Sequence, residues 1–180
     1  MERIIVIELR IKETVEDILS ACNMIAKNLG ETATEELKAD VSAPDTREHR
    51  GIICRAHTAA LGMLKYKAMK YLTTGRTEDD NRLERLGTST TDPTTGEETV
   101  VYEKVTLRLN IPNFNTSATE ALKSFAHRYV VDYVLWRFLQ NQAEEKAIEY
   151  KKLADEQDLP QFEEALRARE TITNRTPSWV

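Results

Sequence analysis

The chain has 180 residues, of which 41% are hydrophobic and 31% are charged, and its formal net charge is −5 at pH 7. This composition excludes a disordered chain, and the length is sufficient for one hydrophobic core. The negative net charge argues against a general nucleic-acid-binding surface, because it supplies no net counter-charge to phosphates. The sequence still allows a local basic patch, so we expect at most weak, non-specific contact with DNA.

The two cysteines and the N-terminal residues indicate in which cellular compartment we expect the protein. Cys22 and Cys54 lie between apolar residues in helix-like patterns, which predicts small buried side chains rather than a disulfide framework. The apolar N-terminus is short and contains Glu8 and Arg10, which is not the pattern of a signal peptide. No stretch approaches the ~20 apolar residues that a membrane-spanning helix needs. We therefore expect a protein kept in a cytosol-like compartment, with no membrane partner.

The first third of the chain predicts a strand and two helices. Residues 3–11 alternate between apolar and other positions, which is typical of a strand. Thr14 would begin a helix, with Asp17 as a capping-box-like partner. Residues 45–72 predict a long helix, because their apolar residues recur at helical spacing.

Residues 87–111 predict a β-hairpin. The turn falls at residues 92–96, where Pro93 presets φ and Gly96 permits a positive φ. The second half of the hairpin alternates cleanly between apolar and polar residues up to Ile111. Because the N-terminal strand has a matching pattern, we expect it to join the hairpin in one small sheet.

Residues 117–139 form the most apolar helical pattern of the chain. From Tyr129 to Leu139 almost every position is apolar, so the helix should be buried on more than one side. Either the sheet and the long helix cover it, or one side faces another subunit. A thin amphipathic helix at residues 144–154 and a last helix beginning near Pro160 follow.

The predicted fold class is α+β, a mainly helical bundle with a small antiparallel sheet made of the N-terminal strand and a β-hairpin near 88–111. Residues 1–169 would form a single α+β domain with a β-hairpin arm at 87–111. Residues 170–180 would form a C-terminal tail. Trp179 offers a large apolar surface, so it should dock either on its own domain or on a neighbouring subunit.

Histidines provide the first candidates for chemistry. Cys54 and His57 would share one helix face and could begin a metal site, but no second pair has a recognised spacing, and His49 lies about 80° away around the helix. His127 could act as a base, yet no nucleophile stands in an elbow-type turn. The structural alternative, hydrogen-bonded helix residues, is favoured for all of them.

Charged clusters provide the remaining candidates. The acidic run Glu78, Asp79 and Asp80 is interpreted as a solvated face or helix start rather than a metal or acid–base site. The basic aromatic residues are Lys65, Tyr66, Lys67, Lys70, Tyr71 and Arg76. They could touch nucleic acid, although an ordinary exposed face with snorkelling lysines is favoured. Phosphate-binding glycine motifs are absent from the sequence. The sequence thus predicts no catalytic, cofactor-binding or metal-ligating residues, and no cofactor.

The helical pattern of residues 121–169 resembles the C-terminal helices of phage head–tail connector and neck (tail-completion) structural proteins. The matching residues are Tyr133, Val134, Leu135, Trp136 and Arg137, followed by Ala147, Tyr150, Phe162 and Leu166. The N-terminal strand and the hairpin depart from the simplest all-helical connectors. The resemblance implies a non-enzymatic virion protein, assembled in the host cytoplasm. It would form a homo-oligomer, expected to be a ring, that connects the head or portal to the tail.

Two other function classes compete with this expectation. One is a monomeric or dimeric adaptor or regulatory binding module of bacterial or prophage origin, which docking of Trp179 on its own core would favour. The other is an enzyme, which a deep pocket with convergent polar groups around His127 or the Cys54–His57 pair would favour.

Overall fold

The computed structural model describes residues 4–29, 33–42, 47–73, 87–91, 98–102 and 104–169. Predictions for the acidic run at residues 78–80, the turn at 92–96 and the tail at 170–180 with Trp179 lie outside the described residues. The helices are α1 (Ile11–Asn28), α2 (Glu35–Ser42), α3 (Arg47–Ala68), α4 (Thr119–Leu139), α5 (Glu144–Lys152) and α6 (Leu159–Leu166). The strands are β1 (Ile4–Arg10), β2 (Gly87–Thr91), β3 (Glu98–Tyr102) and β4 (Lys104–Asn110). The predicted α+β, mainly helical fold class is confirmed.

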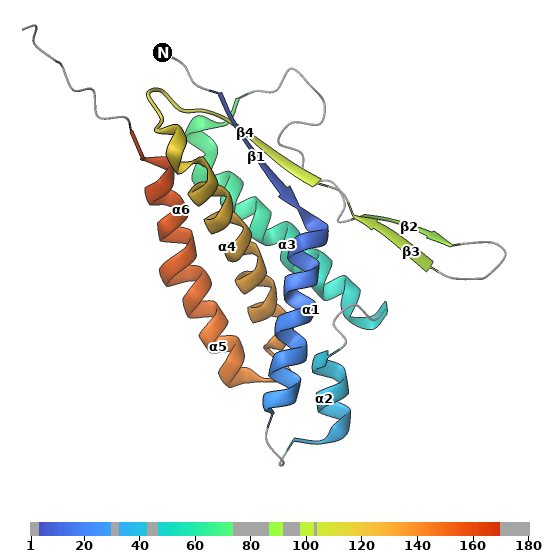
Figure 1. Cartoon of the computed structure of the whole chain (residues 1–180). Coiled ribbons are helices and arrows are strands. Elements are labelled where there is room, and N and C mark those ends of the chain that lie inside the picture. The colour runs from blue at the N-terminus through green and yellow to red at the C-terminus, as the bar shows by residue number, and fades with distance from the viewer. Residues whose placement is uncertain are drawn as a thin grey trace, which may run out of the picture.

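The strands form two separate antiparallel sheets of two strands each, β1–β4 and β2–β3. The expected single sheet is therefore wrong, although the alternation within β1 and β4 is correct. Both strands turn alternate apolar residues, such as Ile7 and Leu107, into the core. The β2–β3 hairpin, here called the arm, projects away from the helices (Figure 1). Its strands contact each other far more than they contact the bundle.

Helix α4 lies at the centre of the bundle, and α1, α3, α5, α6 and β1 all contact it (Figure 1). Its large apolar residues, including Tyr129, Leu135 and Phe138, are buried. Tyr133 and Trp136 are half-buried and pack against the same core. The wide apolar surface of α4 is thus covered by the chain itself, which leaves no need for another subunit there.

Helix α1 begins at Ile11, directly after β1, and not at Thr14 as predicted. Thr14 is fully buried, and its hydroxyl donates a hydrogen bond to the Ile11 carbonyl at 2.8 Å. Asp17 instead faces His127 on α4. The predicted capping box is wrong, because Thr14 lies inside the helix and bonds back to Ile11, while Asp17 makes a tertiary contact with α4.

Helices α5 and α6 are joined by a π-helical segment, Leu153–Asp158. Helix α6 begins at Leu159, as predicted, but it follows the π segment directly, and Pro160 stands in its first turn. Short π segments occur often at sites with a special side-chain arrangement. Here the segment ends at Asp158, which is a buried charged residue.

Candidate functional site

His57 is buried between α3 and α1, at 1% exposure. Its Nε2 lies 2.8 Å from the hydroxyl oxygen of Thr14, whose own proton is committed to the Ile11 carbonyl. His57 Nε2 must therefore carry the proton and donate it to Thr14. Nδ1 has no hydrogen-bond partner among the described residues, so a second proton there would be buried without an acceptor. Burial, and secondarily the charge of His127, lower the pKa of His57 to about 4.

A pH-dependent loss of stability follows from His57. The unfolded histidine binds a proton below about pH 6.5, whereas the folded one resists protonation, so stability should fall as the pH drops from 6.5 through 4. We expect a loss of about 3 kcal/mol in the free energy of unfolding over this window. His57→Gln, which keeps a donor for Thr14 but cannot titrate, should lack most of this loss in urea denaturation series. His49→Gln on the same helix controls for the removal of an imidazole. An unchanged pH slope in His57→Gln would contradict the assignment.

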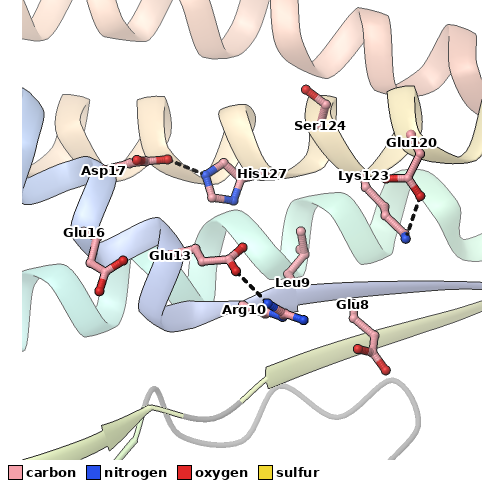
Figure 2. Close-up of a pocket in the computed structure, with 10 residues that line it drawn as sticks. All are labelled: Glu8, Leu9, Arg10, Glu13, Glu16, Asp17, Glu120, Lys123, Ser124 and His127. Carbon is pink, nitrogen blue, oxygen red and sulfur yellow. Dashed lines mark hydrogen bonds and ion pairs between the residues drawn. The ribbon is translucent and has the colours of Figure 1, made fainter.

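His127 and Asp17 form an exposed pair across α4 and α1, with 2.7 Å between Nε2 and Oδ2. They line an open groove of about 530 Å³ together with residues from β1 and the start of α4 (Figure 2). Ser124 lines the same groove, but its hydroxyl points away from the His127 ring (Figure 2). The arrangement is a hydrogen-bonded pair at the surface, and it does not place a nucleophile on the histidine.

This groove, here called the β1 groove, runs between α4 and the edge of β1 opposite β4 (Figure 2). Carboxylates outnumber cations along it, but several are already paired. Arg10 contacts Glu13 at 3.0 Å, and Lys123 contacts Glu120 at 2.9 Å. Its lining residues are Glu8, Leu9, Arg10, Glu13, Glu16, Asp17, Glu120, Lys123, Ser124 and His127.

A carboxyl pair, missed by the sequence analysis, lies between α4 and the π segment. Asp158 is 4% exposed, and its Oδ1 lies 3.2 Å from Nη2 of Arg128, which also donates to Gln161 at 2.7 Å. Burial, a hydrogen bond to Asp158 and the charge of Asp158 raise the pKa of Asp132. Oδ2 of Asp158 is buried and has no hydrogen-bond partner among the described residues. Asp132 and Asp158 share a side-chain hydrogen bond, which two carboxyls can form only when one of them keeps a proton, and this explains how the pair is tolerated.

The basic aromatic stretch, apart from Arg76, which lies outside the described residues, lies at the end of α3 and in the 3₁₀ turn Met69–Tyr71. Met63, Tyr66 and Met69 are exposed at 39%, 65% and 61%, and we call these three residues the α3 surface. The cations beside it are partly neutralised, since Lys67 pairs with Glu163 of α6. Tyr71 accepts a hydrogen bond from Arg169 at 3.3 Å. The stretch is therefore an apolar and aromatic surface with basic flanks.

The structure does not bring the remaining predicted candidates together. His49 packs edge-on against Phe138, whereas His57 faces Thr14. Cys54 is half-buried, and burial raises the pKa of the Cys22 thiol to about 12, which makes that thiol unreactive. Within the described residues, no group of three or more histidine, cysteine or acidic side chains could hold a metal ion.

Comparisons with protein-family models, with curated proteins and with solved structures gave no match. Among the described helices, none combines the length and the hydropathy that crossing a membrane requires.

Proposed function

We propose that this protein is a non-enzymatic structural protein of a virion, which assembles with copies of itself into a ring between the head or portal and the tail. The ring would be assembled in the host cytoplasm. Its partners are further copies of the chain and the portal or tail proteins on either side. Contact with DNA would be weak and non-specific.

The observation that supports this proposal best is the pair of unlike exposed apolar surfaces. One is the α3 surface, and the other consists of Ile4 and Val6 on β1, which are 55% and 42% exposed. A ring needs heterologous contacts, in which one patch of a copy meets a different patch of the next copy. Single exposed apolar residues are common on monomers, but the α3 surface groups three within seven residues across the end of α3 and the 3₁₀ turn that follows it.

The residues that carry the family resemblance support the fold more than the assembly. Val134, Leu135 and Phe162 are buried, and Trp136 is half-buried beneath Arg137, whose guanidinium lies 5.3 Å from the ring. They hold α4 against α5 and α6. The contacts between copies must therefore use other surfaces, which directs the experiment to α3 and β1.

We expect the purified wild-type protein to sediment as an oligomer and the double variant Tyr66→Ser/Met69→Ser to shift toward monomer. Both side chains are exposed, so the substitutions should leave the melting temperature within a few degrees of wild type. Met24→Ser is the matched control, because Met24 is 62% exposed on α1, outside both surfaces. A strictly monomeric wild-type protein at high concentration would overturn the proposal and favour an adaptor module.

A further inference from the structure

Strand β1 has one paired edge and one open edge. Its ladder with β4 covers its whole length, from Ile4 opposite Asn110 to Arg10 opposite Lys104. The far edge of β4 is continued by residues 72–73, through the Leu72–Leu109 bridge and a hydrogen bond from Thr73 to Arg108 at 3.1 Å. The other edge of β1 carries no ladder within the described residues and borders the β1 groove (Figure 2).

An open strand edge presents a row of backbone donors and acceptors that can pair with another strand. The outer face of β1 adds side chains to this template, with Ile4 and Val6 exposed at one end and Glu8 and Arg10 at the other. A strand added here would place apolar residues beside Ile4 and Val6 and charged residues beside Glu8 and Arg10. The edge therefore suits an extended segment with a mixed, ordered pattern.

The arm is a two-stranded ribbon that lacks a third strand among the described residues. It is a ribbon of two five-residue strands that projects from the bundle (Figure 1). An isolated two-stranded hairpin is marginally stable in water, and a third strand stabilises it. The sequence of β3, Glu-Thr-Val-Val-Tyr, is rich in residues that favour strands.

A chain cannot place β3 on the open edge of its own β1. Only residue 103 separates β3 from β4, so Tyr102 and Lys104 are at most about 7 Å apart. Lys104 pairs with Arg10 on the opposite side of β1, and crossing β1 requires two strand spacings, about 9.6 Å. A β3 strand on this edge must therefore come from a second copy.

We propose that β3 of a neighbouring copy adds antiparallel to the open edge of β1, so that copies join head to tail through their arms. This inference rests on the proposed self-assembly and adds to the exposed apolar surfaces a contact between β1 and the arm of the next copy. The register that we propose sets Tyr102 opposite Val6 and Glu98 opposite Arg10, a cation that Glu13 also contacts.

Disulfide trapping tests the contact on the full-length chain. We expect oxidation of a mixture of Val6→Cys and Tyr102→Cys proteins to give a covalent heterodimer, which reducing agent reverses. Each variant alone should give little dimer, because the paired positions belong to different copies. Thr88→Cys mixed with Val6→Cys is the matched control, since Thr88 lies on β2 of the same arm.

A second variant removes the arm. Replacing residues 88–101 by a short Gly–Ser linker should leave the bundle folded, with unchanged helical circular dichroism, and should abolish assembly. The expected result is a wild-type oligomer, a covalent heterodimer in the mixture and a monomeric armless variant.

Other outcomes separate this inference from the proposed function. An oligomeric wild type with no trapped heterodimer and an armless variant that still assembles would overturn the arm contact and leave self-assembly standing. Self-crosslinking of Val6→Cys alone would also overturn it, in favour of β1 pairing with β1. A monomeric wild type would overturn both proposals.

Discussion

Arg128→Met should lower the free energy of unfolding by about 3 kcal/mol, because it leaves the buried Asp158 carboxylate without its cation. The Arg128 side chain is half-exposed, whereas that of Asp158 is 6% exposed, so the charge left behind is the one that water cannot reach. Methionine keeps much of the packing of the arginine stem over Phe125, whose ring centre lies 5.1 Å from the guanidinium carbon. Urea denaturation at pH 7 measures the loss.

Arg137→Met is the matched control for this change. Arg137 lies on the same helix and over an aromatic ring, Trp136, but its hydrogen-bond partner is the neutral, exposed Gln140. Replacing Arg137 should lower the free energy of unfolding by less than about 0.5 kcal/mol. In the Arg128→Met/Asp158→Asn double variant much of the stability should return, since no uncompensated charge remains. Equal losses for the two arginines would show that the ion pair with Asp158 is not the reason.

Asp132→Asn should raise the free energy of unfolding at pH 7 by about 2 kcal/mol, after allowance for the half-exposed position of Asp132. Asparagine offers a permanent N–H donor to the Asp158 carboxylate, where the wild-type protein must retain a proton on Asp132. Asp155→Asn, an exposed change within the π segment, should leave stability within about 0.5 kcal/mol of wild type.

The raised pKa of Asp132 determines whether the free energy of unfolding rises or falls with pH. Burial and Asp158 raise the pKa of Asp132 from 3.8 to about 8, so the folded state holds more protons than the unfolded state between these values. Stability from this group is present in full below pH 4 and is lost as the pH rises through 8. Asp132→Asn should flatten that decline in thermal melts taken from pH 6.5 to 8.5. A variant with the wild-type slope would contradict the shared-proton interpretation.

His57 and Asp132 have opposite effects in acid. Between pH 6.5 and 4 the buried histidine makes the protein less stable as the pH falls, while the carboxyl pair makes it more stable. Above pH 6.5 the contribution of His57 is constant, and the slope from the carboxyl pair stands alone. The two single variants therefore separate the contributions.

Local patterns in the sequence predicted the individual elements well. The alternation that ends at Ile111 gave β4, and the apolar helical stripe gave α4 with its buried Tyr129 and Leu135. The two cysteines were expected to be small buried residues, and Cys22 is one, while Cys54 is half-buried. These signals are periodic, so they need no knowledge of distant neighbours.

Pairings between distant residues were not predictable from the sequence. Thr14 and His57 are 43 positions apart, and their contact depends on how α1 crosses α3. Asp132 and Asp158 meet only because the π segment turns Asp158 toward α4, and the sequence 153–158 carries no local mark of a π-helix. The pairing of β1 with β4 in one sheet and of β2 with β3 in another likewise depends on contacts between distant segments, which the alternation within a strand does not encode.

Electron microscopy of the purified full-length protein tests self-assembly most directly. Negatively stained particles should be closed rings of one diameter, and class averages should show a single cyclic symmetry. The armless variant, prepared in the same buffer, should show no rings. A field of uniform single-copy particles from the wild-type protein, at concentrations where sedimentation also reports a monomer, would contradict the account.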